Sequence, residues 1–343
     1  MQYKRVVITR HGGPEVLQVV ENELPQPQAG QVRVRILAAG IANTDAMLRA
    51  SNVPALGAPS PPYTPGKELV GLVDKLGEGV SSVRVGQMVA ACLSATFGAY
   101  AQSLCVPESD LVPVPRDLDP ARAVCLVANY VVAYQVLHRA AQVAPGERVL
   151  NHGAAGGIGT ALLQLGRLAG LEMYGTASTG KQAFVANLGA IPIDYKQEDF
   201  VERISSLTGD GVDVVCDAIG GSYVRRSYKT LRPGGRLVVF GGVSFAAEGM
   251  LAMLWNNMIL THILNALPDN KATLNYFMRG GAKKHSRPEW YREDLSKLFD
   301  LLARNKIEPI ITRMPLVEAA RAHELIGEAA VKGKVVLMCT DQG

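Results

Sequence analysis

The chain has 343 residues, of which 48% are hydrophobic and 19% charged, and its formal net charge is +4 at neutral pH. This length exceeds the roughly 250–300 residues at which a single hydrophobic core stops growing, so two domains are expected. The small net charge and the scattered basic residues exclude the strong basic face that a nucleic-acid-binding protein would need.

The cysteines and the N-terminus bear on the compartment. Five cysteines lie far apart and form no Cys-x-x-Cys pair. That spacing excludes a disulfide framework and a four-cysteine zinc lobe and is typical of a reducing compartment. The first residues lack the apolar core of a signal peptide, and we expect no run of the roughly 18 apolar residues that a membrane span requires. A cytoplasmic protein is therefore predicted.

The N-terminal part of the chain, up to about residue 118, is rich in short predicted strands. Runs at 5–9, 17–21, 31–39 and 69–76 lie between Gly and Pro residues and show little helical periodicity. This pattern predicts a small, partly open antiparallel β-barrel.

The pattern changes near Pro120. Residues 121–141 form a long apolar helical stretch, and strands expected at 171–176, 212–216 and 235–240 then alternate with helices such as 223–231. Such alternation predicts an α/β domain with a doubly wound parallel sheet and right-handed crossovers. The apolar segment 258–264 is expected to be the last strand of that sheet. Helices at 294–304 and 316–329, with strands at 307–311 and 335–338, are expected to return to the first domain.

The stretch from Val149 to Gly159 combines a short hydrophobic strand, a glycine-rich turn and the start of a small-residue helix. In this arrangement backbone N–H groups and a helix N-terminus converge on a pyrophosphate. Gly156 lets the backbone approach the phosphates and Gly159 lets the helix pack on the strand, although Ala154 replaces the first glycine of G-x-G-x-x-G. We predict a dinucleotide site, with a plain tight turn as the alternative.

The end of the next predicted strand indicates which dinucleotide binds. NAD enzymes usually carry Asp or Glu there for the ribose 2′-hydroxyl, whereas this chain has Ala177 followed by Ser178 and Lys181. Hydroxyl donors and a cation suit a 2′-phosphate, so NADPH is the predicted cofactor. Lys181 on a solvated helix face is the alternative. Tyr195 is a candidate to cover the adenine end, or else a packing residue.

Four motifs in this order resemble the medium-chain dehydrogenase/reductase superfamily, and within it the zinc-independent quinone oxidoreductases. They lie at 62–71 (Pro-Tyr-Thr-Pro-Gly-Lys-Glu with Gly71), 77–80 (Gly-x-Gly-Val), 152–159 (His-Gly-Ala-Ala-Gly-Gly-Ile-Gly) and 232–236 (Arg-Pro-Gly-Gly-Arg). The resemblance covers essentially the whole chain. Segments at 128–134, 175–178 and 192–195 look closest to the branch that includes the synaptic-vesicle amine-transport protein homologue.

The resemblance implies a GroES-like substrate domain at 1–122 and 306–343 and a Rossmann domain at 123–305. Of Tyr130 and Tyr134, four residues apart on one helix, we expect one to contact the cofactor or the cleft and the other to pack. The cofactor contacts predicted in the chain are Tyr134, Ala155, Gly156, Gly157, Ile158, Ser178, Lys181, Tyr195, Phe240 and Gly241.

The positions of the catalytic metal ligands differ from those of zinc-dependent relatives. Such relatives have a Cys and a His at the places of Ala42 and Lys67. Alanine has no ligand atom and an ammonium repels a divalent cation, so no metal is predicted. Without a Lewis acid to ionise an alcohol, reduction of a quinone or of a C=C bond conjugated to a carbonyl remains. An enoyl-CoA reductase and a mainly non-catalytic NADPH-binding protein are the alternatives.

Three residues are candidates for catalysis. Asn43 is next to Ala42, where quinone reductases usually have Asn, and Val53 stands where they often have Tyr. Tyr63 is a candidate donor to the substrate oxygen, or a packing residue beneath the Pro-Gly turn. Lys67 is a candidate to steady an enolate oxygen, or a solvated lysine.

Two further segments concern partners. The basic cluster 279–287, with Lys283 and Lys284, is either a grip for the phosphates of a coenzyme A thioester or a solvated loop. Edge strands can pair with another chain, and the members of the family that the sequence resembles commonly dimerise at the strand expected at 258–264. We therefore expect a homodimer, with His262 at the interface or in the core.

Overall fold

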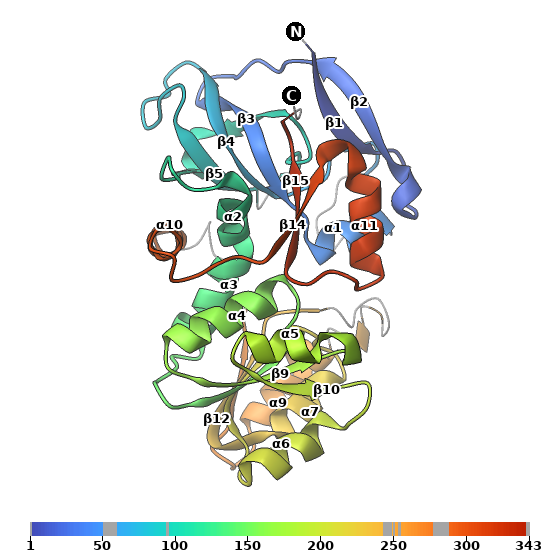
Figure 1. Ribbon diagram of the computed structural model, residues 1–343, viewed down its shortest axis with the longest axis vertical. Helices are drawn as coiled ribbons and strands as arrows, with labels where there is room; N and C mark the ends of the chain where they lie inside the picture. Colours follow the sequence, from blue (N-terminus) through green and yellow to red (C-terminus); the bar gives the residue numbers. More distant parts are fainter. Residues whose placement is uncertain are drawn as a thin grey trace. The chain divides into compact units, whose positions relative to one another are not determined.

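The computed structural model describes residues 2–50, 60–93, 96–242, 249, 251–252, 255–276 and 288–340. The chain divides into two compact units, one made of Met1–Ala128 with Leu295–Gly343 and the other of Asn129–Asp294 (Figure 1). The first unit is built mainly of β-strands and the second of alternating strands and helices, which confirms the expected α/β class.

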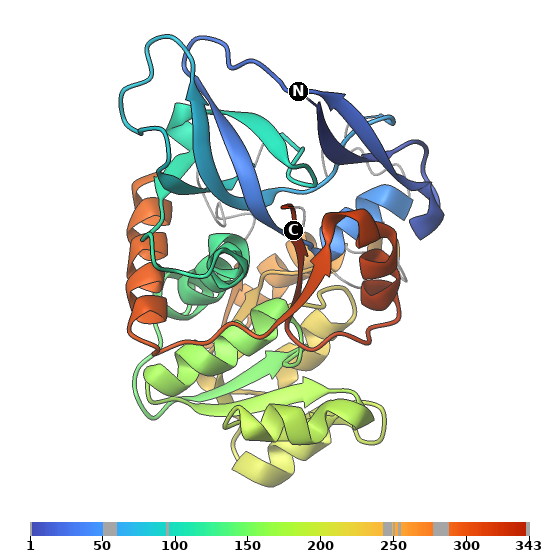
Figure 2. The same ribbon diagram turned by 45° about the horizontal axis from the view of Figure 1, so that its top comes forward.

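The first unit contains a seven-stranded sheet in the order β14-β15-β3-β4-β5-β7, with β6 also paired to β3, and a separate β1-β2 hairpin. All pairs except β14 with β15 are antiparallel, as a partly open barrel requires. Helices α1 and α11 lie side by side (Figure 2). The elements are β1 (Gln2–Ile8), β2 (Leu17–Glu23), β3 (Gln31–Gly40), α1 (Asn43–Ala50), β4 (Glu68–Leu76), β5 (Met88–Cys92), β6 (Ser103–Pro107), β7 (Leu111–Pro113), α2 (Pro120–Cys125), α10 (Pro288–Ala303, whose first residues belong to the second unit), β14 (Ile311–Pro315), α11 (Ala319–Gly327) and β15 (Lys334–Met338).

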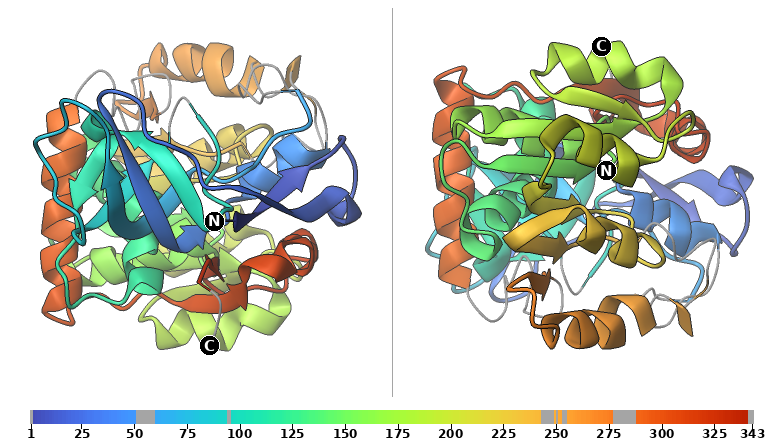
Figure 3. Two further views of the ribbon diagram at one scale, coloured as in Figure 1. Left: turned by 90° about the horizontal axis from the view of Figure 1, so that it is seen from above. Right: turned by 90° about the horizontal axis from the view of Figure 1, so that it is seen from below.

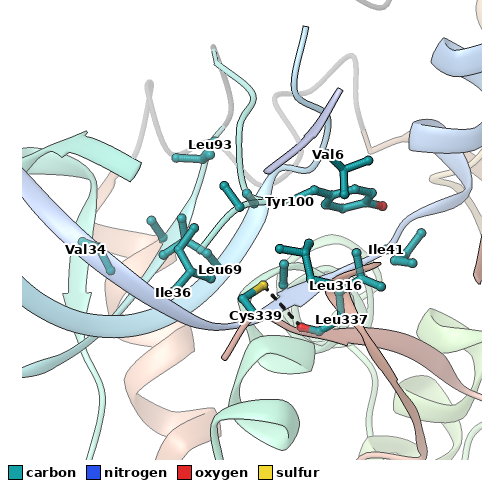
Figure 4. Close-up of a cluster of buried hydrophobic side chains, with 14 of the residues drawn as sticks. Val6, Val34, Ile36, Ile41, Leu69, Leu93, Tyr100, Leu316, Leu337 and Cys339 are labelled. Carbon is teal, nitrogen blue, oxygen red and sulfur yellow. Dashed lines mark hydrogen bonds between the residues drawn. The ribbon is translucent and has the colours of Figure 1, made fainter. Parts of the chain in front are cut away.

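The core of the first unit forms because strand side chains alternate between its inside and its outside. Along β3, Val32, Val34 and Ile36 are fully buried and the residues between them are more exposed. Figure 4 shows Val34 and Ile36 gathered with buried side chains of other strands, and the Cys339 thiol donating to the Leu337 carbonyl at 3.7 Å. This packed interior fixes the register of the strands that carry the candidate catalytic residues.

The second unit is a six-stranded parallel sheet in the order β10-β9-β8-β11-β12-β13. In such an order the chain starts in the middle and winds outward twice, so ligands bind at the carboxyl ends of the central strands. Its elements are α3 (Val131–Tyr134), β8 (Arg148–His152), α4 (Gly157–Leu168), β9 (Glu172–Ala177), α5 (Gln182–Asn187), β10 (Ile191–Asp194), α6 (Phe200–Thr208), β11 (Val212–Asp217), α7 (Tyr223–Lys229), β12 (Leu231–Val239), α9 (Thr261–Asn265) and β13 (Ala272–Asn275).

The prediction of a last strand at 258–264 is wrong. Residues Trp255–Leu260 form a π-helical turn that continues into α9, and β13 is the edge strand instead (Figure 3). Short apolar runs do not distinguish a strand from a helix, and here every fourth residue is apolar and exposed. His262 is an exposed residue of α9, so its expected place in a core is also wrong.

Two other expectations need adjustment. The strand expected at 307–311 begins only at Ile311 and runs to Pro315. The helix from Pro120 to Ala140 includes two π-helical stretches, and it is long and apolar enough to cross a membrane, a test that we expected no segment to pass. However, 72% of its most apolar window is buried inside the structure, as in a core helix.

Candidate active site

The glycine turn after β8 supplies backbone N–H groups at the centre of the sheet. Gly153 has a φ of +72°, which L side chains rarely adopt, and a Cβ at Gly159 would overlap the Gly153 carbonyl oxygen. Gly156, at the residue before α4, contributes no side-chain cap to the helix. Because the first N–H groups of a helix have no intrahelical acceptor, these residues fit the pyrophosphate of a dinucleotide.

The carboxyl ends of β9 and β10 lie next to this turn. Ala177 pairs in register with Asp194, so Ser178 and Tyr195 follow neighbouring strands. Ser178 and Lys181 are half-buried around a short 3-10 turn, and the Tyr195 ring is 42% exposed. These three predicted residues therefore come to one edge of the sheet.

The ends of β11 and β12 border the other side of the same edge. Asp217 accepts hydrogen bonds from the N–H groups of Ile219 at 2.8 Å and Gly220 at 2.9 Å, and its carbonyl accepts from the Phe240 N–H at 3.0 Å. A Cβ at Gly241 would overlap the Ala218 carbonyl oxygen. The backbone after both strands is thus packed too closely to admit a side chain at residue 241.

The two tyrosines near the start of the second unit occupy different environments. Tyr130 is buried and donates to the Gln164 side chain at 3.1 Å. Tyr134 is half-buried, with its ring centroid 4.5 Å from that of His138. Contact of Tyr134 with a cofactor stays a prediction.

A buried polar chain beneath the glycine turn was missed by the sequence analysis. His152 bonds through Nδ1 to Thr176 at 3.1 Å and through Nε2 to Ser227 at 3.1 Å. The partners belong to β9 and α7, so only the folded sheet brings them together. The one available signal was the polar His152 at the end of a strand whose middle residues, Val149 and Leu150, are apolar.

The candidate catalytic residues lie in the first unit. Asn43 is the exposed first residue of α1, and the Lys67 ammonium lies 4.4 Å from the centre of the Phe97 ring. Tyr63 is 8% exposed and packs edge-on against Phe97, and burial raises the pKa of its hydroxyl to about 12. Buried in this way, Tyr63 is part of the hydrophobic core of the unit.

The donor set does not fit a catalytic zinc ion. Ala42 has no ligand atom in its side chain; its backbone N–H donates to the Asp45 carboxylate at 2.9 Å and its carbonyl accepts from the Asp45 N–H at 3.0 Å. Lys67 is a cation whose ammonium lies over an aromatic ring. No group of three His, Cys, Asp or Glu side chains within the described ranges is placed to hold a metal.

Glu68, next to Lys67, already has a cationic partner. Its carboxylate lies 2.8 Å from the Lys334 ammonium, and both side chains are buried. Burial opposes the charge of Lys334, but the Glu68 carboxylate beside it raises the lysine pKa above its ordinary value. The missing side chain of Gly40 makes room for this ion pair, because a Cβ there would lie 2.5 Å from the Glu68 Oε2 atom.

Some predicted residues cannot be placed. Val53 and the basic cluster 279–287, with Lys283 and Lys284, lie outside the described residues. The choice between a coenzyme A grip and a solvated loop therefore stays open.

Comparison with known proteins adds to this geometry. A family model of zinc-binding dehydrogenases matches residues 188–337, and one of the alcohol dehydrogenase GroES-like domain matches residues 28–116. A 2-haloacrylate reductase from Burkholderia sp is 32% identical over 340 residues, covering 97% of this chain and 98% of that protein. The human synaptic vesicle membrane protein VAT-1 homolog is 31% identical, covering 97% and 86%. The Escherichia coli quinone oxidoreductase complexed with NADPH aligns with a TM-score of 0.85 at 28% identity, covering 98% and 99%.

Proposed function

Because the chain belongs to the medium-chain dehydrogenase/reductase family of oxidoreductases, we propose that it is an NADPH-dependent, zinc-independent reductase of quinones or of alkenes conjugated to a carbonyl group. The observation that carries the proposal is the glycine turn after β8 with Ser178 and Lys181 beside it and no carboxylate directly after β9.

The second unit holds the cofactor in this proposal. Gly156 and Gly157 bring the backbone N–H groups of Ala155 and Ile158 to the pyrophosphate at the N-terminus of α4. Phe240 and Gly241 border the nicotinamide end, and Tyr134 is the proposed contact from α3. When bound, the cofactor supplies the hydride, and the protein supplies orientation and excludes water.

Selection of the 2′-phosphate depends on Ala177, the last residue of β9, and on the residues that follow it. A carboxylate at residue 177 would repel a phosphate dianion, and Ala177 removes that repulsion. The Ser178 hydroxyl and the Lys181 ammonium provide donors, and Tyr195 offers an exposed aromatic face for the adenine. The NADPH in the similar quinone oxidoreductase structure supports this choice.

The first unit determines the acceptor. Ala42 and Lys67 do not supply a Lewis acid, so ionisation of an alcohol is not favoured. An acceptor whose oxygen takes up negative charge as hydride adds to carbon suits the Lys67 ammonium and the Asn43 amide, which we propose as the groups that stabilise the enolate. Tyr63 is buried, so a catalytic role for it is the least favoured of the three. The 2-haloacrylate reductase relative, named for an activated alkene, supports this acceptor class.

An acceptor panel tests the proposal. Purified protein treated with EDTA is mixed with NADPH and a quinone, an enone, a 2-haloacrylate or crotonyl-CoA, and oxidation of NADPH is followed at 340 nm. We expect saturable turnover with a quinone or an activated alkene. Turnover with crotonyl-CoA alone would make the protein an enoyl thioester reductase. Tight NADPH binding without turnover on any acceptor would make it a cofactor-binding protein of another role.

We propose a homodimer that forms on the helical face next to β13, and a cytoplasmic location. Trp255, Ile259, Ile263 and Leu267 are 53%, 47%, 49% and 44% exposed, and their spacing of four residues puts them on one face. Residues 255–266 include no Asp, Glu, Lys or Arg, so two copies related by a twofold axis would bring no like charges together.

The edge of β13 itself is partly covered. The Tyr276 N–H donates to the Val239 carbonyl on β12. Because backbone groups alternate in direction along a strand, the N–H and C=O of Thr273 point to the open edge, away from β12. Both groups bond to the Asn265 side chain, at 2.5 and 2.9 Å. This supports packing of the helical face over strand-to-strand pairing. Light scattering should show a dimer for the wild type and a monomer for Ile259→Glu. A monomeric wild type that binds lipid vesicles would contradict both the proposed dimer and the proposed location.

A further inference from the structure

Six hydrogen bonds form one continuous chain beneath the glycine turn of the second unit. The Gly153 N–H donates to the Thr176 hydroxyl at 3.3 Å, and that hydroxyl lies 3.1 Å from His152 Nδ1. His152 Nε2 lies 3.1 Å from the Ser227 hydroxyl, which donates to Asp217 Oδ2 at 3.0 Å. At the far end Asp217 Oδ1 accepts two backbone N–H groups of the loop after β11. The chain therefore joins the loops that follow β8 and β11.

The direction of each bond is set from the two ends. A carboxylate can only accept hydrogen bonds, so the Ser227 hydroxyl donates its hydrogen to Asp217. The Ser227 oxygen must therefore accept the hydrogen bond from His152 Nε2. This places the imidazole proton on Nε2 and leaves Nδ1 as an acceptor. The Thr176 hydroxyl then gives its hydrogen to Nδ1 and turns a lone pair toward the Gly153 N–H.

The surroundings of the imidazole favour its neutral form. His152 is 1% exposed, and its ring packs edge-on against Phe200 and Tyr223, which stack on one another with centroids 5.5 Å apart. The Arg226 guanidinium covers Phe200 at 4.3 Å. Burial lowers the pKa of His152, with Asp217 opposing this effect and Arg226 adding to it.

We propose that His152, as the neutral Nε2–H tautomer, is a positioning residue for the cofactor: it orients the Thr176 hydroxyl so that this hydroxyl holds the Gly153 N–H. Through Gly153 the chain holds the glycine turn in place for the phosphates. The turn also donates a second hydrogen bond to the same residue, from the Ala154 N–H to the Thr176 carbonyl at 3.0 Å. This role in binding rests on the proposed function, since it concerns NADPH.

Variants of Thr176 test the contact with the turn. Thr176→Val keeps the shape of the side chain and removes the hydroxyl, and Thr176→Ser keeps the hydroxyl. We expect the NADPH dissociation constant to rise about tenfold in the valine variant, the change that about 1.4 kcal/mol produces, and to stay within about twofold in the serine variant. Thr261→Val is the matched control, because this buried hydroxyl donates to the Met258 carbonyl at 2.8 Å outside the chain of bonds.

Variants of His152 test the imidazole itself. His152→Asn offers an amide oxygen near the place of Nδ1 and should bind NADPH more tightly than His152→Leu, which removes both bonds. Equal affinities of wild type, Thr176→Val and His152→Leu would overturn the proposal. A loss of thermal stability in the leucine variant without rescue of binding by the asparagine variant would reduce His152 to a packing residue.

A spectroscopic measurement on the ligand-free wild type does not depend on NADPH binding. Long-range ¹H–¹⁵N NMR distinguishes the two neutral tautomers and the imidazolium, and His152→Asn assigns the signal. We expect the Nε2–H tautomer at pH 7. An Nδ1–H tautomer or a charged ring would contradict the inference. If the wild type shows this tautomer but binds no NADPH, the proposed function fails and the bond directions stand.

Discussion

The Asp45 carboxylate accepts a hydrogen bond from the Tyr100 hydroxyl at 3.1 Å, and both side chains are buried in the first unit. The same carboxylate accepts from the Ala42 N–H, and the Tyr100 hydroxyl lies 3.3 Å from His323 Nε2. This relationship ties the start of α1, which carries Asn43, to α11. It also makes stability depend on pH.

Burial raises the pKa of Asp45 from 3.8 to about 6, with Glu68 adding to this effect and Tyr100, the Ala42 N–H and Lys334 opposing it. Between pH 4 and 6 the folded state therefore binds more protons than the unfolded state at this residue, so stability is lost as pH rises. Relative to Asp45→Asn, we expect the free energy of unfolding of the wild type to fall by up to ~3 kcal/mol across this window. Urea unfolding of both proteins at several pH values measures this, and parallel curves would refute it.

Gly159→Ala should destabilise the protein by more than about 2 kcal/mol, because the added Cβ overlaps the backbone of the glycine turn. Gly327→Ala is the control, since a Cβ there meets nothing within 4 Å in helix α11 and alanine favours a helix. Thermal unfolding of the two variants makes the comparison. An unchanged melting temperature in Gly159→Ala would show that the helix does not approach the turn this closely.

Ala177→Asp should reverse the preference for the cofactor. The new carboxylate would repel a 2′-phosphate and accept from a 2′-hydroxyl, so affinity for NADPH should fall by at least about tenfold and affinity for NADH should hold or improve. Ala177→Ser serves as the uncharged control. Calorimetric titration of both variants with both cofactors reads the effect, and an equal loss for NADPH and NADH would speak against a phosphate at this position.

Lys67→Met removes the ammonium and keeps the length of the side chain. If Lys67 stabilises an enolate, kcat should fall by about 10–100-fold while NADPH affinity stays the same. Phe97→Leu controls for the ring beneath the ammonium, 4.4 Å away. Unchanged turnover of Lys67→Met would remove this residue from the mechanism.

The sequence pattern correctly predicts features that depend on neighbouring residues, namely the barrel strands and the glycine turn. The barrel strands alternate, the glycine turn carries its own conformational demands, and both appear as expected. The last strand is predicted in the wrong place because residues 258–264 are apolar although they form a helix whose apolar face is exposed. The true strand, Ala272–Asn275, is short and half polar, and Asn265 and β12 together satisfy its backbone. Neither feature has a local signal.

The same limit applies to the candidate site. Ser178 and Lys181 could be proposed because they closely follow the strand predicted at 171–176, and Tyr195 directly follows β10. The partners of His152 are 24 and 75 residues away, and Tyr100 and His323 are separated by 223 residues. Hydrogen bonds between such distant residues depend on how the strands are ordered in the sheet, which composition and periodicity do not encode.

The relative affinity of the wild type for NADPH and NADH tests the central claim most directly. Isothermal titration calorimetry of the EDTA-treated protein with each cofactor, in the same buffer, gives both dissociation constants. The account predicts that NADPH binds at least about tenfold more tightly. Equal or tighter binding of NADH, or binding that requires added zinc, would contradict it.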